Sequence, residues 1–177
     1  MVPFCPESKL SGIGNTDFMN CVWYRKNFSI PENWKGKRIF LNFGAVDYHA
    51  TVYINGEYAG EHKGGYTPFS FDITNLLRAE NNYVTVCAVD HVRSFNQPAG
   101  KQSAELASHG CFYTRTTGIW QTVWLECVSE NYVKSIKAYA DIDAPAVTLE
   151  IKLSPCSDGS VINAKAFFEG KFVGEGT

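Results

Sequence analysis

The chain has 177 residues, of which 45% are hydrophobic, 14% aromatic and 19% charged, and its formal net charge is −2. This length and composition indicate one folded globular domain with part of another, and they exclude the disordered and fibrous classes. The sequence lacks a block of Lys and Arg, which excludes the electrostatic footprint of a nucleic-acid binder or of a protein bound to an anionic membrane.

Six segments of the first 130 residues alternate apolar and polar side chains with a period of two, separated by turn residues. They are Val22–Ile30, Lys37–Phe43, Ala45–Asn55, Tyr66–Ile73, Asn82–Asp90 and Ile119–Val128. This pattern predicts strands, and no window of ten residues shows a convincing helical stripe. Asn55-Gly56 has the residue types that a type I′ turn requires and predicts a hairpin. The best helical candidate is one turn at Thr74–Arg78, with Thr74 as its cap.

Strands of this number can bury their apolar faces by packing two sheets or by closing a barrel. The regular turn spacing favours the first solution, so we expect residues 1–130 to form a jelly-roll-like, galactose-binding-domain-like β-sandwich. One segment, His91–Cys111, shows no strand pattern. Loops this long within a compact domain are commonly functional or mobile.

A second β domain is predicted to begin after the polar linker Ser129–Asn131. New alternating runs follow, at Val147–Leu153 and Ile162–Phe168. Residues 131–177 are too few for an immunoglobulin-like sandwich, which takes about 100 residues and seven strands. We therefore expect an incomplete domain with unpaired edges and an uncovered apolar face.

The six cysteines are too widely spaced for a zinc or redox motif, and no metal or cofactor is predicted. Cys87 and Cys127 lie in apolar runs and are expected to act as small buried hydrophobes. No apolar run approaches the length of a membrane span, and the first residues lack the features of a signal peptide. We expect a soluble protein of the bacterial cytoplasm or periplasm, with the compartment left open.

Several short motifs occur together and in a fixed order between Val2 and Val128. They are Trp23-Tyr24-Arg25-Lys26, Phe43-Gly44-Ala45-Val46-Asp47-Tyr48, Val52-Tyr53-Ile54-Asn55-Gly56, Gly64-Gly65-Tyr66-Thr67-Pro68-Phe69, Phe71-Asp72-Ile73-Thr74 and Thr117-Gly118-Ile119-Trp120. In this combination the chain resembles the amino-terminal sugar-binding domain of glycoside hydrolase family 2, the group of β-galactosidases, β-glucuronidases and β-mannosidases. Residues from Tyr132 onward resemble the start of the immunoglobulin-like domain that follows in that family.

The resemblance implies a parent enzyme that hydrolyses β-glycosides with retention, using two carboxylates about 5–5.5 Å apart on a (β/α)₈ barrel. A barrel needs about 250 residues, so we expect no catalytic residue here and an inactive fragment. The acidic candidates are expected to be solvated surface charges; they are Glu57, Glu61, Glu105 and Glu126. The implied partners are a β-glycoside or oligosaccharide and the catalytic barrel, with a homo-oligomeric parent left open.

Five residues are predicted to lie near the substrate in the parent enzyme. In several family members an aspartate six residues before the glycine that matches Gly118 contacts the sugar, and here this position is Phe112, which could form an apolar wall instead. Arg115 matches an arginine of some members and has a structural or interface role as its alternative. Asn96, Lys101 and Gln102 belong to the loop that could project toward the barrel.

Other motif residues have structural explanations. Gly64-Gly65 suits a sharp turn where a Cβ would clash, and Asp72 with Thr74 can bind backbone donors at a strand end. The aromatic residues Trp23, Trp120 and Trp124 are expected to fill a core or a domain interface. Two alternatives to an accessory domain remain: a free-standing carbohydrate-binding module, and a purely structural or interaction domain.

Overall fold

The computed structural model describes residues 1–94, 96–154 and 159–177, so Cys156 lies outside the described residues. Its regular elements are strands and short 3₁₀ turns at Lys9–Ser11, Glu32–Trp34 and Thr74–Leu76. The prediction of an all-β chain is confirmed. The chain divides into two compact units, Met1–Val128 and Ser129–Thr177.

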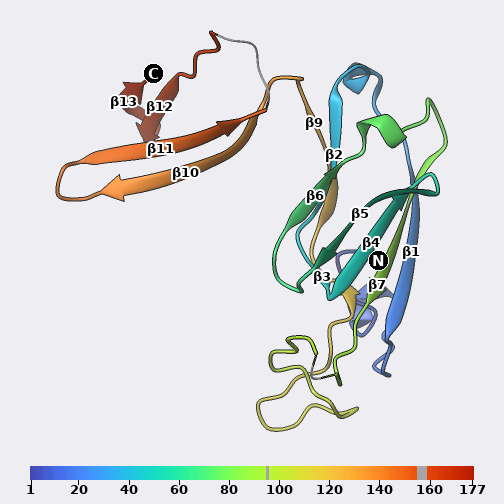
Figure 1. Ribbon diagram of the computed structural model, residues 1–177. Coiled ribbons are helices and arrows are strands. Elements are labelled where there is room, and N and C mark those ends of the chain that lie inside the picture. Colours follow the sequence, from blue (N-terminus) through green and yellow to red (C-terminus); the bar gives the residue numbers. More distant parts are fainter. Residues whose placement is uncertain (95, 155–158) are drawn as a thin grey trace. The chain divides into compact units, whose positions relative to one another are not determined.

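The first unit contains two packed antiparallel sheets (Figure 1). One has the order β1 (Cys21–Phe28), β7 (Asn82–Val89), β4 (His49–Ile54) and β5 (Glu57–Lys63). The other has the order β6 (Phe69–Asp72), β2 (Arg38–Phe43) and β9 (Val123–Val128). A short separate ladder joins β3 (Val46–Asp47) to β8 (Gly118–Ile119). The predicted β-sandwich is therefore present.

The core lies between these sheets and is built from alternate residues of each strand. Strand β4 contributes Ala50, Val52 and Ile54, all fully buried, and the facing strand β2 contributes Ile39, Leu41 and Phe43. Burying each of the larger side chains stabilises the fold by about 1.5–3 kcal/mol. The apolar residues that recur at every second position in the sequence are thus those on the strand face that the other sheet covers.

The hairpin between β4 and β5 turns at the predicted dipeptide. Asn55 and Gly56 have φ values of 55° and 89°, both in the left-handed region that a type I′ turn requires. The side chain of Asn55 also fixes the turn in place, since its amide donates to the carbonyl of Leu76 at 2.8 Å. This prediction is confirmed.

Two predicted strands are each divided by a change of partner. Ala45–Asn55 contains β3 and β4, and Ile119–Val128 contains the end of β8 and then β9. β3 pairs with β8, whereas β4 pairs with β7 and β5. A period of two reports which side of a strand is buried but not which strand lies beside it, so the sequence pattern continued across both breaks.

The 3₁₀ turn after β6 is held differently from the prediction. Thr74 is the first residue of the turn and not its cap. The carboxylate of Asp72 accepts hydrogen bonds from the backbone and hydroxyl of Thr74, at 3.1 and 2.5 Å. The Thr74 hydroxyl oxygen accepts from the backbone N–H of Ile39 at 2.9 Å. The two side chains therefore do bind backbone donors, as expected, but the cap residue is Ile73, whose side chain makes no capping bond.

Three side chains that the sequence could place in the core lie outside it; the expectation of a buried Cys87 is wrong, whereas an interface role for the two tryptophans stays a prediction. Trp23 and Trp124 lie on the outer faces of the two sheets, 61% and 44% exposed, outside the core. Cys87 is half-buried on the outer face of its sheet, where its Sγ lies 3.5 Å from that of Cys21. Cys127, in contrast, packs against the core as predicted. In each case the alternation of the strand is correct but the outer face carries a large or apolar residue.

The second unit consists of two hairpins. One joins β10 (Val133–Asp141) to β11 (Ala146–Leu153), and the other joins β12 (Ala164–Phe168) to β13 (Lys171–Gly176). Every side chain of β10 is exposed. Large apolar side chains are exposed as well, including Phe167, Phe168 and Phe172 at 61%, 69% and 55%. The apolar faces of these hairpins are therefore uncovered within the unit.

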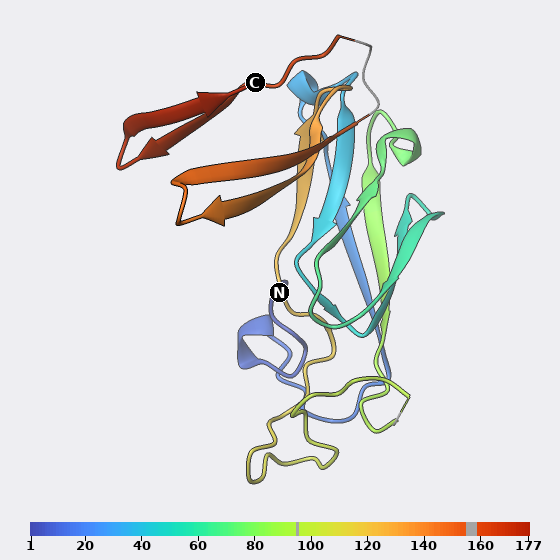
Figure 2. The same cartoon turned by 60° about the vertical axis from the view of Figure 1, so that its left-hand side comes forward.

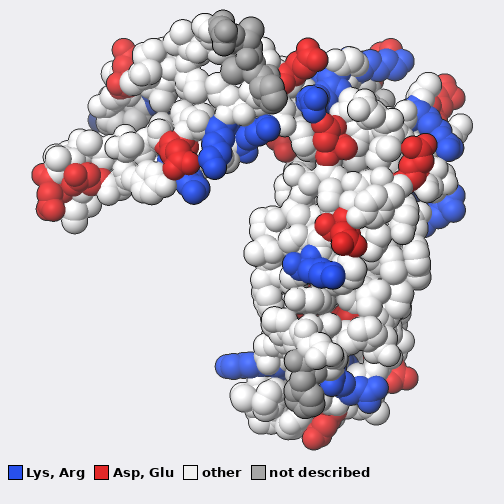
Figure 3. Space-filling model, viewed as in Figure 1, with Lys and Arg blue, Asp and Glu red and all other residues white. Residues whose placement is uncertain are grey.

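Within the described part of the chain, no helix is long and apolar enough to cross a membrane. Figure 3 shows that most of the visible surface of the first unit is uncharged; charged side chains are most frequent toward its two ends and also occur on the middle of this face.

Candidate functional site

The long segment between β7 and β8 forms an irregular loop at one end of the sandwich, beside the N-terminal segment (Figures 1 and 2). Only isolated bridges interrupt it in its described part, at Gln102–Tyr113 and His109–Phe112. Such a loop has few backbone bonds of its own, so side chains must hold it. Two of the predicted site residues, Arg115 and Gln102, do this.

Arg115 is only 2% exposed and binds three backbone carbonyl groups. Its guanidinium donates to the carbonyl oxygens of Ser103 and Glu105, at 3.3 and 2.5 Å, and to that of Thr16. The same group stacks over the ring of Phe18 at 4.1 Å. A planar guanidinium with several donors suits this arrangement. Arg115 therefore ties the loop to the N-terminal segment from inside.

Gln102 is the second anchor and is 6% exposed. Its side-chain nitrogen donates to Oδ2 of Asp47 at 2.8 Å, and its oxygen accepts from the backbone of Thr116 at 2.7 Å. One amide thus joins the middle of the loop, and its last residues before β8, to the end of β3. Sequence reasoning placed Gln102 in the loop but had no signal for its partner.

Three carboxylates lie buried behind this anchor: Asp47, Asp90 and Glu7 are 3%, 2% and 7% exposed. Burial, followed by the negative charge of Asp90, raises the pKa of Asp47 to about 6. Burial also raises the pKa of Asp90, whose Oδ1 accepts from the side chain of Gln97 at 2.6 Å. Glu7 accepts from the backbone of Thr117 through both oxygens, at 3.1 and 3.2 Å. The region carries an excess of buried negative charge.

A pocket of about 200 Å³ opens beside Asp47. It is lined by aromatic and polar side chains from three separate segments: Asp47, Tyr66, Gln102, Tyr113, Thr116 and Trp120. Tyr66 and Trp120 form two nearly perpendicular walls, with ring centroids 5.8 Å apart and an interplanar angle of 74°. Trp120 is held by a 2.8 Å hydrogen bond from its indole to the carbonyl of Gly65.

Two glycines allow this close packing. A Cβ at Gly65 would lie 2.6 Å from Oδ1 of Asp47. Gly118 has a φ of 77°, and a Cβ there would lie 2.3 Å from the hydroxyl of Tyr24. That hydroxyl accepts from the backbone of Ile119 at 3.2 Å. These two glycines of the sequence motifs therefore let the backbone pass close to a neighbouring side chain. The clash predicted for a Cβ at Gly64-Gly65 is found at Gly65.

The five residues predicted to approach the substrate fall into two groups. Asn96, Lys101 and Phe112 are exposed on the loop, and Phe112 stacks on His109 with centroids 5.3 Å apart. Gln102 lines the pocket, whereas Arg115 is enclosed beneath the loop. The residues that sequence reasoning missed are Asp47, Tyr66, Tyr113 and Glu7. Asp47 and Tyr66 stand within the quoted motifs, but nothing in a single sequence separates a pocket residue from a packing residue there.

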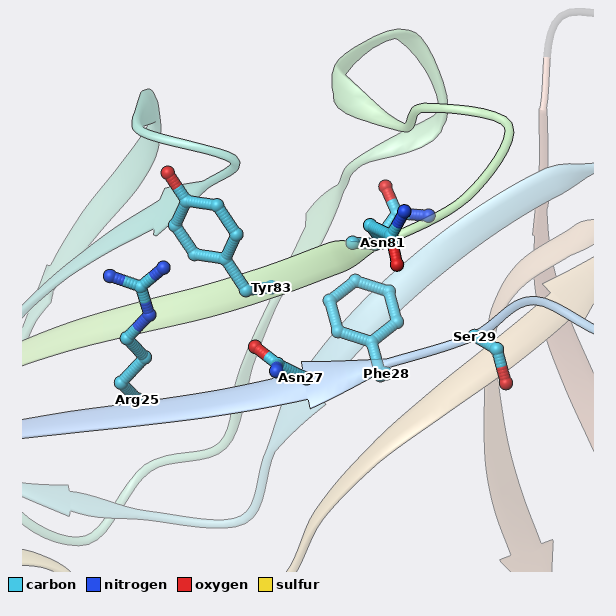
Figure 4. A pocket seen from close by; sticks show the side chains of 7 residues that line it. Arg25, Asn27, Phe28, Ser29, Asn81 and Tyr83 are labelled. Atoms are coloured by element: carbon cyan, nitrogen blue, oxygen red, sulfur yellow. The ribbon is translucent and has the colours of Figure 1, made fainter.

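A second, larger depression of about 530 Å³ lies at the ends of β1 and β7. Figure 4 shows Arg25 and Tyr83 among the side chains that line it, and the Arg25 guanidinium lies 4.0 Å from the Tyr83 ring centroid. Asn82, which also lines it, already binds the backbone of Arg78 in both directions. None of the lining residues is acidic. Within the described residues, no group of His, Cys, Asp and Glu is placed to hold a metal ion.

Comparison with known proteins gives a consistent result. Residues 13–127 match the family described as glycosyl hydrolases family 2, sugar binding domain. A β-galactosidase of Thermoanaerobacter pseudethanolicus is 33% identical over 161 residues, covering 90% of this chain and 20% of that protein. A β-glucuronidase of Rattus norvegicus is 26% identical over 180 residues, covering 91% of this chain and 28% of that protein.

Solved structures agree. The β-glucuronidase of an uncultured Clostridium species aligns with a TM-score of 0.70 and 26% identity, covering 99% of this chain and 31% of that one. The β-glucuronidase of Bacteroides uniformis aligns with a TM-score of 0.55 and 33% identity, covering 66% of this chain and 13% of that one. The chain thus spans less than a third of the length of each of these proteins.

Proposed function

The chain belongs to glycosyl hydrolase family 2, and we propose that it serves as a non-catalytic accessory domain of an enzyme that hydrolyses β-glycosides. The observation that carries this proposal is the loop between β7 and β8. It is clamped from within by Arg115 and Gln102, and it presents Asn96, Lys101 and Phe112 to solvent. A rigidly held loop with exposed polar and aromatic side chains is suited to shaping one wall of a neighbouring site.

The arrangement of carboxylates supports a non-catalytic role. Retaining glycosidases need two carboxyl groups about 5–5.5 Å apart that flank one sugar. Of the acidic residues that the structure describes, only Asp47 lines the 200 Å³ pocket, and none lines the larger depression. The four glutamates considered from the sequence are exposed: Glu57, Glu61, Glu105 and Glu126. Hydrolysis is accordingly assigned to a catalytic barrel carried on a longer chain.

Substrate and partners follow from the relatives. The proteins named above are a β-galactosidase and β-glucuronidases. We propose a β-glycoside or oligosaccharide as the substrate of the parent enzyme, an intramolecular contact with its barrel, and homo-oligomerisation as an open alternative. The second unit is proposed to be the first part of an immunoglobulin-like sandwich, and its uncovered apolar side chains support this assignment.

The experiment has two arms. The purified 177-residue chain should show no turnover of nitrophenyl β-galactoside or β-glucuronide. In the full-length enzyme, a Lys101→Ala, Phe112→Ala double variant should lower kcat/KM about tenfold, while Lys63→Ala, an exposed lysine on β5, should leave it unchanged. Turnover by the chain that a substitution within it abolishes would overturn the proposal. Unchanged kinetics in the loop variant would favour a purely structural domain.

A further inference from the structure

Two cysteines lie in sulfur contact on the outer face of the four-stranded sheet. Cys21 is the first residue of β1, and Cys87 lies in β7, the strand beside it. The register places Trp23 opposite Cys87, so Cys21, two residues before Trp23, points to the same face. The two Sγ atoms are 3.5 Å apart, although 66 residues separate them along the chain. Neither thiol lines either of the two pockets described above.

The two thiols differ in accessibility, and this difference orders their reactions. Cys21 is exposed, whereas Cys87 is half-buried. Burial first, and then the hydrogen bond and the charge of Cys21, raise the pKa of Cys87 to about 11. Cys87 therefore stays protonated at neutral pH, and Cys21 is the thiol that a dissolved reagent meets first.

The position of the pair in the sheet allows the two sulfur atoms to come closer. A disulfide holds its sulfurs about 2.05 Å apart, so the two Sγ atoms must approach each other by about 1.5 Å. Cys21 follows a bend at Asn20 and is the end of an edge strand, where the backbone adjusts at little cost. Cys87, in contrast, lies in a strand with partners on both sides. We expect Cys21 to make the movement.

We propose that Cys21 and Cys87 form a redox-active pair, which a low-molecular-weight disulfide such as oxidised glutathione converts into an intrachain disulfide. The Cys21 thiolate attacks one sulfur of the reagent, a bond from Cys21 to that sulfur forms, and one thiol leaves. Cys87 then loses its proton, attacks the Cys21 sulfur and expels the second thiol. The two protein thiols are thereby oxidised, and the reagent is reduced to two thiols. The mixed disulfide favours this second step, because the thiol and the charge of Cys21 no longer raise the pKa of Cys87.

The cross-link fastens the place where two irregular segments meet the sheet. The N-terminal segment enters the sheet at Cys21, and the loop to β8 leaves it after Val89. Next to the pair, the backbone of Asp90 donates to the carbonyl of Asn20 at 3.0 Å. Because β1 has a strand neighbour on one side only, its start opens more easily than β7 does. The disulfide holds the two segments together under oxidising conditions and releases them under reducing ones.

The test treats the folded 177-residue chain with oxidised glutathione and maps its peptides, which shows the state of each cysteine separately. The peptides of Cys21 and Cys87 should be recovered linked, with the mixed disulfide below about a tenth of the chain, because the second thiol is already in contact. Cys87→Ser should stop at the mixed disulfide on Cys21, and Cys21→Ser should leave Cys87 a free thiol. Cys111→Ser is the matched control: Cys111 is an exposed cysteine outside the pair, and its loss should leave the link unchanged.

Thermal unfolding gives a second measurement. The midpoint of the oxidised chain should lie at least about 5 °C above that of the reduced chain, because the link closes a long loop in the unfolded state. The shift should be absent from Cys21→Ser and present in Cys111→Ser. The proposal is overturned if the pair stays reduced while Cys111 is modified, if the link forms only in denaturant, if Cys87→Ser leaves Cys21 unmodified, or if oxidation does not raise the midpoint. The accessory role is tested separately, by the kinetics of loop variants in the full-length enzyme.

Discussion

Asp47 is a carboxylate that the fold buries at a cost. Its pKa in the folded chain is about 6, against an ordinary value of 3.8, because burial and the charge of Asp90 disfavour the ionised form. A raised pKa means that the folded state binds the proton more tightly than the unfolded state. The resulting stabilisation is complete below about pH 4 and is lost as the pH rises through about 6.

Replacing Asp47 with Asn should therefore stabilise the first unit at neutral pH. A shift of this size corresponds to roughly 1–3 kcal/mol once water penetration into the site is allowed for. The free energy of unfolding of the Asn variant, minus that of the unaltered chain, should be near zero at pH 4 and rise to its full value by pH 7. Denaturant unfolding at several pH values measures this difference. A difference that is constant with pH would show that Asp47 has an ordinary pKa.

A substitution at Gly118 tests whether the backbone of β8 packs tightly against the side chain of Tyr24. Gly118→Ala combines a φ of 77° with a Cβ 2.3 Å from the Tyr24 hydroxyl. The left-handed backbone costs about 1–2 kcal/mol and the forced displacement about 1–3 more, giving about 3 kcal/mol in total. Gly12→Ala is the control, because its φ is 82° and nothing lies within 4 Å of the added Cβ. Equal losses in thermal unfolding of the two variants would mean that Tyr24 makes no tight contact there.

The role of a single residue can be predicted from the sequence only where the local backbone conformation determines it. Asn55 and Gly56 were identified correctly because a two-residue hairpin has one dominant chemistry. Glu7 and Asp47 were not identified, because their burial depends on partners 110 and 55 residues away along the chain, Thr117 and Gln102. The resemblance to the family points to Arg115 as a candidate site residue. Its three carbonyl partners cannot be inferred from the sequence, because the folded loop brings them together.

Among the elements, the loop between β7 and β8 has a buried cation, Arg115, as one of its two anchors. Arg115→Lys keeps the charge but replaces a planar group with a point charge that cannot reach three carbonyl oxygens at once. We expect a loss of about 2–4 kcal/mol in unfolding free energy and rapid cleavage of the loop in limited proteolysis.

The control for that variant is Arg93→Lys. The Arg93 guanidinium also stacks on Phe18, at 4.0 Å, but this side chain is exposed. Its replacement should change stability by less than about 0.5 kcal/mol. If both variants are cleaved at the same rate as the unaltered chain, the three carbonyl contacts of Arg115 do not hold the loop.

The strands themselves were largely predictable, since each buried face repeats every second residue. The divisions at Tyr48 and between Ile119 and Val123 were not, because they arise where a strand exchanges one neighbour for another. The alternation of apolar and polar residues also does not predict the role of a large apolar side chain on the outer face of a sheet. Trp23 and Trp124 occupy outer positions and could not be told from core tryptophans by pattern alone.

At the scale of the whole molecule, the two units differ in how their hydrogen bonds are protected. Central strands β4 and β7 have partners on both sides and contribute fully buried residues to the core. The hairpins of the second unit are two-stranded, and β10 buries no side chain. An isolated two-stranded hairpin is at best marginally stable in water. The stability of the chain should therefore reside in Met1–Val128.

Hydrogen exchange on the full chain tests this difference directly. Amides of β4 and β7 should exchange only through global unfolding, at least ~10³-fold more slowly than in an unfolded chain, whereas those of β10 to β13 should be protected less than about tenfold. The reason is that opening a hairpin whose apolar side chains are already exposed loses almost no buried area. Protection of β10 and β11 equal to that of β4 would contradict this. If that protection fell on dilution, a second copy of the chain would be covering the exposed Phe167, Phe168 and Phe172; if it did not, the hairpins would be packed within one chain.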